Sequence, residues 1–232
     1  MKIIGDGQLA NIFKNCNLED TIIFASGVSN SNCKDKNEFK REQDLLLYHL
    51  IGAKDKKFVY FSSCALSAEN YELNAYYKHK QNMENLIKEN STNYYIFRLP
   101  QLFGNLKKHS TLINFIYNSI INDIEFTVFD EAYRYVIEIS DVKKIVQSFL
   151  LNHHPNTIID ITNTYRYSVL DIVNTLEKLL NKRAKYKVID KKDQYILDLS
   201  YIIQYVNKHN IDVPFGKEYL EKKLIKQLLQ KE

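Results

Sequence analysis

The residues best suited to chemistry in this chain are a tyrosine and a lysine four positions apart. Tyr76 and Lys80 lie in the stretch YYKHKQNME, and residues at this spacing share one face of a helix. A tyrosine with an ordinary pKa of about 10 is a poor acid or base at neutral pH, but a nearby cation favours its charged form. We therefore expect Lys80 to lower the pKa of Tyr76 and to make the phenol a proton carrier.

The spacing by itself does not distinguish a catalytic pair from a coincidence. The chain contains 17 tyrosines, and a second pair with the same spacing, Tyr219 and Lys223, occurs near its end. About two such pairs are expected by chance in a sequence of this composition. The neighbouring segments must therefore decide which pair, if either, is catalytic.

A serine at the end of an expected strand precedes the first pair. The strand-like run KFVYFSS (57–63) ends in Ser63, before the segment that carries Tyr76. Its hydroxyl could bond a substrate oxygen beside the phenol and share the charge that develops there. The alternative is that the serine only caps the end of a strand.

A glycine-rich turn stands at the start of the chain. The segment GDGQLA (5–10) follows an apolar run and opens a helical one, so Gly5 can make a tight turn and Gly7 can let a pyrophosphate approach the helix N-terminus. The alternative is a turn without a ligand. The acidic residue expected about 20 positions later to bind a ribose has no clear candidate.

These residues need a scaffold, and the pattern of apolar residues indicates one. Short apolar runs alternate with longer segments of helical period, which is typical of βα units in a parallel sheet. The second half of the chain has a weaker pattern, with Ser168 as an expected N-cap. In the first half we expect strands at 2–5, 21–27, 57–63 and 93–100 and helices at 7–15, 38–52 and 71–90. Further on we expect helices at 110–121, 141–152, 168–182 and from Gly216, and strands at 125–129, 134–139 and 157–161.

Composition narrows the function classes. Apolar residues make up 45% of the chain and charged residues 26%, as in ordinary soluble proteins. The net charge of +4 comes from scattered lysines, which suits a small anionic ligand better than a nucleic acid. The three cysteines are widely spaced and predict no metal site. We find no signal peptide or apolar run long enough for a membrane span, so we expect a cytoplasmic protein.

Several motifs occur together in a recognisable order. VYFSS (59–63) is followed by Tyr76, Lys80 and Glu84, then by RLPQLFG (98–104) and RYVIEISD (134–141). This order resembles the extended short-chain dehydrogenase/reductase family, especially its nucleotide-sugar epimerases, dehydratases and 4-ketoreductases. Tyr76 lies within this series of motifs, whereas Tyr219 has neither the serine strand before it nor the arginine strand after it.

The resemblance implies a fold and a function. The fold would be α/β, a shortened Rossmann-like doubly wound parallel sheet with a small C-terminal α+β lobe. Residues 1–160 would bind NAD or NADP, with part of the substrate lobe inserted near 105–130, and residues 161–232 would bind a nucleotide-diphosphate sugar. The implied function is reduction of a 4-keto sugar or epimerisation in surface polysaccharide biosynthesis. The alternative is a non-catalytic or weakly active relative that only binds a nucleotide sugar.

The resemblance also implies roles for single residues. The implied catalytic residues are Tyr76, Lys80 and Ser63, and the implied substrate contacts are Ser63, Gln101 and Arg134. For Arg134 the alternative is a surface ion pair with Glu131 or Glu138. For Arg98, which lies on an expected strand, the alternative is a structural role. The implied cofactor contacts are Gly5, Gly7, Gln8, Leu9, Ala25, Ser26, Gly27, Tyr76, Lys80 and Pro100.

Two departures from the family pattern have consequences. The glycine motif is shortened, and the strands that normally lie between the first helix and TIIFASG (21–27) look deleted. Few contacts to the adenosine of a dinucleotide are then expected.

The family also commonly forms dimers through the helices expected at 38–52 and 71–90, and both have apolar residues on more than one face. We therefore expect a homodimer; the alternative is that the C-terminal helices cover these residues.

Overall fold

The computed structural model describes residues 1–53, 55–69, 71–107 and 111–229. The chain forms two compact units, of which the first comprises Met1–Leu99 and Val142–Ile161 and the second Pro100–Asp141 and Thr162–Glu232. The second unit takes more of the middle of the chain than the 105–130 stretch expected from the sequence. The reason is that two strands at the ends of that middle segment pair with each other, Gln101 with Val136 and Phe103 with Glu138.

The first unit contains a five-stranded sheet in the order β1-β2-β3-β4-β8, and all its pairings are parallel. β1 is an edge strand among the described residues, so the sheet lacks the strands that the sequence predicted to be deleted. The predicted shortened parallel sheet is confirmed. Its strands are β1 (Lys2–Ile4), β2 (Thr21–Phe24), β3 (Lys57–Ser63), β4 (Tyr94–Leu99) and β8 (Thr157–Asp160).

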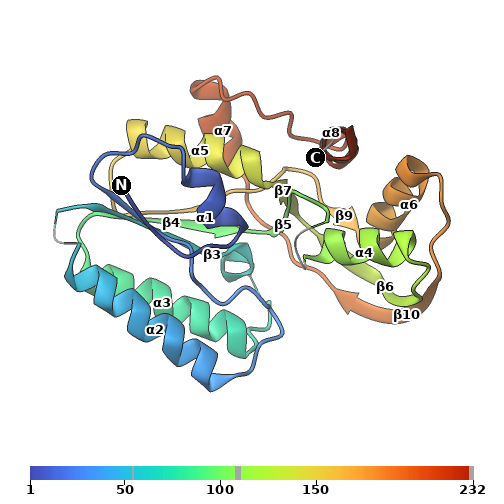
Figure 1. The fold of residues 1–232 in the computed structure, drawn as a ribbon, viewed down its shortest axis with the longest axis horizontal. Helices are drawn as coiled ribbons and strands as arrows, with labels where there is room; N and C mark the ends of the chain where they lie inside the picture. Colours follow the sequence, from blue (N-terminus) through green and yellow to red (C-terminus); the bar gives the residue numbers. More distant parts are fainter. Residues whose placement is uncertain (54, 70, 108–110, 230–232) are drawn as a thin grey trace. The chain divides into compact units, whose positions relative to one another are not determined.

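Helices cover both faces of this sheet, as expected for a doubly wound fold (Figure 1). Alternate strand residues point to opposite faces. Phe61 and Phe97 face the side of α1 and α5, where they lie against Phe13 and Phe149. The other face packs under α2 and α3 through Ile22, Phe24, Leu46, Leu50, Phe58, Tyr60, Met83, Ile87 and Ile96. The helices are α1 (Gln8–Phe13), α2 (Lys36–Ile51), α3 (Ala75–Asn90) and α5 (Ile139–Asn152), with the 3₁₀ turn η1 (Cys64–Ser67) after β3.

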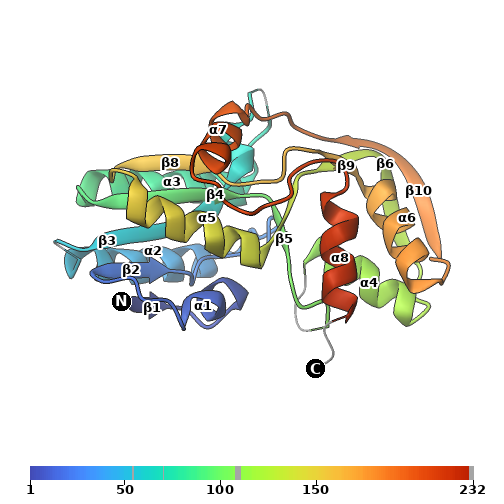
Figure 2. The ribbon, with the colours of Figure 1, turned by 90° about the horizontal axis from the view of Figure 1, so that it is seen from above.

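The second unit has a mixed three-stranded sheet, in the order β10-β6-β9, and the parallel pair β5-β7. Ser168 caps α6 in a capping box with Asp171, as the sequence predicted. Figure 2 shows α6 and α8 side by side, and these helices are in contact. The strands are β5 (Gln101–Phe103), β6 (Phe126–Arg134), β7 (Val136–Glu138), β9 (Tyr167–Ser168) and β10 (Tyr186–Asp193). The helices are α4 (Leu112–Ile121), α6 (Val169–Leu180), α7 (Ser200–Lys208) and α8 (Tyr219–Leu229).

Four elements of the second unit, β5, β9, β10 and α7, were not predicted. Most residues of β10 are exposed and many are charged, so the strand lacks the apolar alternation by which strands are found. Residue 110, where the sequence placed the start of the helix now seen as α4, lies outside the described residues. The same is true of 230–232, the end of the tail helix.

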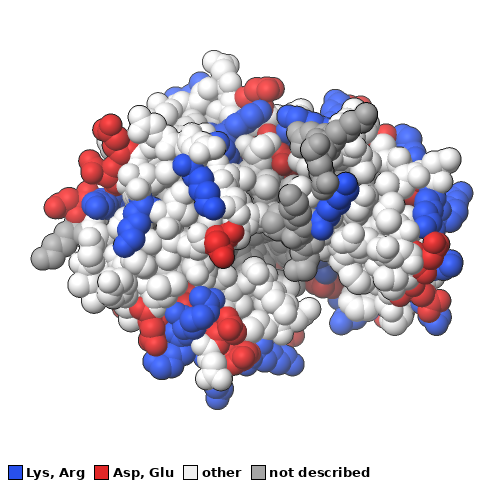
Figure 3. Space-filling model, viewed as in Figure 1, with Lys and Arg blue, Asp and Glu red and all other residues white. Residues whose placement is uncertain are grey.

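On the face shown in Figure 3, positive and negative side chains are interspersed, in agreement with the scattered lysines of the sequence. No helix in the described part of the chain is long and apolar enough to cross a membrane.

Candidate active site

Tyr76 and Lys80 lie on the buried face of α3, as predicted from their spacing. The helix begins at Ala75 rather than at residue 71, because the side chain of Asn74 caps it by accepting a hydrogen bond from the Tyr77 amide, at 3.0 Å. Both side chains are almost completely buried, with 8% of Tyr76 and 2% of Lys80 exposed. The pair is therefore part of the packed interior of the first unit.

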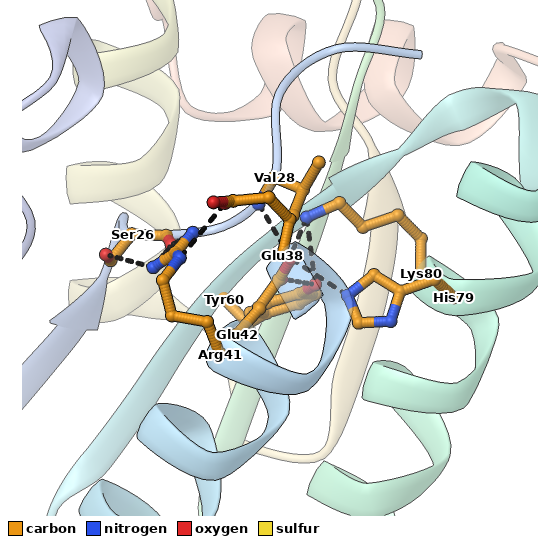
Figure 4. A network of polar contacts seen from close by, with 8 residues as sticks. All are labelled: Ser26, Val28, Glu38, Arg41, Glu42, Tyr60, His79 and Lys80. Carbon is orange, nitrogen blue, oxygen red and sulfur yellow. Dashed lines mark hydrogen bonds and ion pairs between the residues drawn. The ribbon is translucent and has the colours of Figure 1, made fainter. Parts of the chain in front are cut away.

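The Lys80 ammonium has close partners other than the Tyr76 hydroxyl (Figure 4). Its Nζ donates hydrogen bonds to Glu42 Oε1, at 2.9 Å, and to the Tyr60 hydroxyl, at 3.1 Å. The same nitrogen lies 5.7 Å from the centre of the Tyr76 ring. Lys80 thus contacts the aromatic ring of Tyr76 while forming an ion pair with a carboxylate on α2.

Glu42 is the centre of this buried network. Its carboxylate accepts hydrogen bonds from the Val28 amide at 2.7 Å, the Tyr60 hydroxyl at 2.6 Å and Lys80 at 2.9 Å, and it lies 2.9 Å from His79 Nε2. Burial disfavours the charged carboxylate, but Lys80 and these hydrogen bonds together lower the pKa of Glu42 to about 2. Glu42 is therefore ionised at neutral pH although none of it is exposed.

Sequence reasoning did not identify Glu42. The residue stands in a helix rich in charged side chains, and most glutamates in such helices are solvated. One signal was available: Glu42, Leu46 and Leu50 recur at four-residue spacing and are the buried residues of α2. A carboxylate on the apolar stripe of a helix indicates a buried partner.

The expected lowering of the pKa of Tyr76 is not found. Burial raises the pKa of Tyr76 above its usual range, and the Glu42 carboxylate raises it further, as do Tyr77 and Cys64 to a smaller extent. The prediction was wrong because the phenol is buried, and because the Glu42 carboxylate offsets the positive charge of Lys80.

Ser63 lies at the carboxyl end of β3 and begins η1. Its Oγ accepts a hydrogen bond from the Ala65 amide at 3.4 Å, which is the capping contact considered as the alternative. The hydroxyl of the preceding Ser62 is buried without a hydrogen-bond partner among the described residues. The catalytic role of Ser63 stays a prediction.

The glycine turn has the tight geometry expected from the sequence. Gly5 has a φ of +117°, and a Cβ on it would lie 2.5 Å from the Ala25 carbonyl oxygen, so only glycine lets the ends of β1 and β2 approach this closely. Space is open around Gly7, which begins α1. The side-chain oxygen of Gln8 is buried and lacks a hydrogen-bond partner in the described part of the chain. This open turn with an unpaired polar atom fits the approach of a polar ligand group.

The rest of the first unit fits a dinucleotide less well. A Cβ on Gly27 would lie 2.6 Å from Lys80 Nζ and 2.8 Å from Glu42 Oε1, so the backbone after β2 packs directly on the ion pair. Lys80 therefore has no open path to a ribose hydroxyl in this conformation. On the adenosine side, the described sheet ends at β1. The glycine turn fits a cofactor phosphate, whereas the lysine and the sheet edge do not reproduce the contacts that the resemblance implied.

A second polar cluster contains Arg98. The Arg98 guanidinium makes a bidentate pair with Glu84, at 2.9 and 2.6 Å, and donates to Ser67 Oγ at 2.8 Å. Burial raises the pKa of the neighbouring Asp160 to about 6, although Ser67 and Arg98 act in the opposite direction. The structural interpretation of Arg98 is supported. No group of His, Cys, Asp and Glu side chains in the described ranges is arranged to hold a metal ion.

Pro100, Gln101 and Arg134 belong to the second unit. Arg134, at the end of β6, forms an ion pair with the Asp193 carboxylate and donates to the Asp193 carbonyl oxygen at 2.8 Å. The alternative of an ion pair was thus sound, but its partner is Asp193 on the adjacent strand and not Glu131 or Glu138. Gln101 lies at the start of β5 and is half-buried.

Tyr219 and Lys223, the second pair with catalytic spacing, form a buried cluster in the second unit. The Tyr219 hydroxyl donates to Asp141 Oδ2 at 2.7 Å and accepts from the Glu138 amide at 2.9 Å, and Lys223 Nζ lies 2.5 Å from the same Asp141 oxygen. The cluster joins α8 to β7 and to the first turn of α5. The spacing of four therefore places a tyrosine beside a paired lysine here as well, and only the surrounding segments separate the two pairs.

Known proteins match this chain in their fold but not in their sequence. No protein-family model matches the chain, and no curated protein matches it. UDP-glucuronic acid 4-epimerase from Bacillus cereus, solved with UDP-glucuronic acid and NAD, superposes with a TM-score of 0.72 at 18% identity, covering 96% of this chain and 79% of the epimerase. dTDP-glucose 4,6-dehydratase from Bacillus anthracis, solved with NAD, has a TM-score of 0.71 at 12% identity, covering 90% and 72%. dTDP-4-dehydrorhamnose reductase from the same species, solved with NADP, has a TM-score of 0.65 at 14% identity, covering 89% and 80%.

These neighbours confirm the resemblance at the level of the fold. All three are nucleotide-sugar enzymes with the extended short-chain dehydrogenase/reductase fold, and each is longer than this chain. The chain has that fold in a shortened form, with β1 at the edge of its parallel sheet. Their sequence identity to this chain is below one fifth, so they show its fold but not its reaction or its ligands. The reaction and the ligands must be inferred from the residues.

Proposed function

We propose that the chain is an NAD(P)-dependent enzyme that reduces or epimerises a nucleotide-linked sugar. The observation that supports this most is the convergence of Tyr76, Lys80 and the glycine turn in the first unit. Gly5 packs against the end of β2, and Gly27, three residues after β2, packs on Lys80. Ligands of open parallel sheets bind at this carboxyl edge of the strands.

The residues of the first unit have complementary proposed roles. Tyr76 holds the proton that passes to or from the sugar oxygen, and Ser63 supplies a second hydrogen bond to that oxygen. Lys80 orients the Tyr76 ring and balances Glu42. The cofactor would supply or accept a hydride. Its phosphates would bind at the turn formed by Gly5, Gly7, Gln8 and Leu9, and its nicotinamide half would bind beside Ala25, Ser26 and Gly27.

In the second unit, Arg134 and Gln101 are the proposed contacts of the nucleotide-diphosphate sugar. A guanidinium suits a diphosphate because its N–H groups match two oxygens at once. Arg134 already pairs with the Asp193 carboxylate, so a phosphate would have to displace or share that partner. We place the enzyme in cytoplasmic surface polysaccharide synthesis, as a homodimer through α2 and α3.

One observation favours a second candidate function, a module that binds nucleotide sugars without catalysis. Lys80 is bonded to Glu42 and covered by Gly27, so the cofactor contact that the resemblance assigns to this lysine is blocked. A protein that had lost its dinucleotide would tolerate such a change.

Transfer of an isotopic label separates the two functions. The purified protein would be incubated with NADH or NADPH carrying deuterium at the transferred position, together with UDP- and dTDP-linked 4-keto sugars, and the sugars analysed by mass spectrometry. Ligands released from the denatured protein would be identified in the same way, to detect a retained NAD and an epimerase that recycles it. Deuterium in the sugar, or retained NAD with an epimerised product, supports the enzyme. Binding of a nucleotide sugar without either outcome supports the binding module.

A further inference from the structure

The buried carboxylate of Glu42 is the strongest feature of the first unit that the proposed function leaves without a role. It holds together α2, β3, α3 and the loop after β2 through Tyr60, His79, Lys80 and Val28 (Figure 4). A carboxylate and an ammonium buried at 2.9 Å from each other cancel most of each other's field at a third group nearby. Tyr76 is that third group.

The surroundings of Tyr76 contain little else that would favour ionisation. Lys80 is the cation in contact with its ring, at 5.7 Å from the ring centre. Six other titratable groups act on Tyr76 or on the ion pair, besides Arg41 on the exposed side of α2. These groups are Tyr60 from β3, Cys64 from η1, Glu42 from α2, and Tyr77, His79 and Glu84 from α3.

We propose that Glu42 is a positioning residue that takes up the charge of Lys80, keeps Tyr76 protonated, and so commits the site to donating a proton, as the reduction of a keto sugar requires. This inference rests on the proposed function and decides between its two reactions. The carbonyl carbon would gain a hydride from a reduced nicotinamide dinucleotide, and the electron pair of the C=O π bond would move to the oxygen. That oxygen would take the Tyr76 proton, and the tyrosinate left behind would regain a proton from water.

Epimerisation or alcohol oxidation would place the opposite demand on the site. Its first step removes the proton from a sugar hydroxyl, so the tyrosine must be ionised before it can act as a base. With Glu42 beside Lys80, ionisation of Tyr76 would place a second negative charge near a buried ammonium that already has a carboxylate partner. Reduction does not require ionised Tyr76 at its start, because its proton transfer begins from the protonated phenol.

The test is a titration of the ligand-free protein, which needs no turnover. Tyrosine labelled with ¹³C at Cζ would be followed by NMR between neutral and alkaline pH, with Tyr76→Phe used to assign the signal. In the wild type, Tyr76 should stay protonated where an ordinary tyrosine, with a pKa of about 10, has ionised. In Glu42→Gln, over the pH range in which Lys80 stays protonated, the Tyr76 phenol should ionise about 1–3 pH units lower than in the wild type.

A charge-matched double variant controls for burial. Burial lowers the pKa of Lys80, so this lysine is easier to deprotonate once its carboxylate partner is removed. Glu42→Gln is therefore compared with a variant that has no cation at this position. Glu42→Gln with Lys80→Met removes both charges, and Tyr76 should then stay protonated as in the wild type. Ionisation of Tyr76 near pH 10 in this double variant would overturn the inference, because the pair would then raise the pKa of Tyr76 instead of having no net effect on it. An unchanged titration of Tyr76 in folded Glu42→Gln would overturn it as well.

The relative rates of sugar reduction and sugar oxidation give a second test, which is independent of the Tyr76 titration. The wild type should reduce keto sugars at neutral pH, whereas its rate of alcohol oxidation should rise only at alkaline pH. Glu42→Gln should move that rise to lower pH, together with the Tyr76 titration. Equal oxidation and reduction rates at neutral pH would contradict the commitment to reduction. If no nucleotide sugar is turned over but Tyr76 shifts as expected, the proposed function is wrong while the effect of Glu42 on Tyr76 stands.

Discussion

Replacing Glu42 by glutamine should be among the most destabilising single changes in the first unit. The substitution keeps the shape of the side chain but leaves the Lys80 ammonium buried without its counter-charge. Removing one partner of a buried ion pair typically costs about 3–5 kcal/mol. The pKa of Glu42 gives an independent figure: a fall from 4.5 to about 2 corresponds to about 3 kcal/mol of folding free energy. We therefore expect Glu42→Gln to lose about 3 kcal/mol.

Urea denaturation followed by circular dichroism measures this loss, and the same helix offers a matched control. Glu38 lies one turn earlier on α2 and pairs with Arg41 at 3.1 Å, but 52% of its side chain is exposed. Exposed pairs contribute about 0–1 kcal/mol, so Glu38→Gln should change the unfolding free energy by less than about 1 kcal/mol. A loss of less than about 1 kcal/mol in Glu42→Gln would refute the reasoning that Lys80 depends on this carboxylate.

The same ion pair predicts a dependence on pH. The pKa of Glu42 is lower in the folded chain than its ordinary value of 4.5, so the pair contributes its full stability above about pH 4.5. That contribution is lost as the pH falls toward about 2, because protons then bind more readily to the unfolded chain. Glu42→Gln should lack this part of the acid dependence. An identical acid unfolding profile in the wild type and the variant would contradict the assignment.

Three further predictions concern other parts of the chain. Tyr219→Phe should cost about 1–3 kcal/mol of stability, because it leaves the buried Asp141 carboxylate and Glu138 amide short of a hydrogen bond, but it should leave turnover unchanged; urea denaturation and activity assays test both parts. Binding of NAD and NADP should be weak and poorly selective, because the described sheet ends at β1; a hundredfold preference in a titration of both would show that a ribose contact had been missed. Light scattering should give a dimer at micromolar concentration, and glutamate at Tyr48 and Ile51, which are 72% and 74% exposed on α2, should give a folded monomer; a wild-type monomer with full activity would argue against the interface.

The sequence predicted those parts of the fold that local patterns specify. Apolar runs of strand length located the sheet of the first unit, and the short link from α1 to β2 showed that strands were missing. The buried face of α3 followed from the spacing of Tyr76 and Lys80. A capping residue such as Ser168 is recognisable because its partners are only three residues away.

The contacts that decide the chemistry were not predictable in the same way, because their partners are distant in the sequence. Glu42 meets Lys80 across 38 positions, and Arg134 meets Asp193 across 59. The family pattern placed a lysine beside a tyrosine but did not show which anion would accompany it. The pKa of Tyr76 depends on its burial and on that anion, so the direction of its shift was predicted wrongly from the pair alone.

The most direct test of the proposed enzyme is a comparison of Tyr76→Phe with the wild type in single-turnover reduction of a nucleotide-linked keto sugar. The variant removes the proton that the account assigns to the reaction and keeps the buried ring. Tyr201→Phe, which makes the same change at an exposed position of α7 in the second unit, serves as the control. Loss of general acid catalysis typically costs about 10²–10⁴-fold in rate. The account predicts such a loss in Tyr76→Phe, with the fold and nucleotide-sugar binding retained and the control unaffected; a Tyr76→Phe rate close to that of the wild type would contradict it.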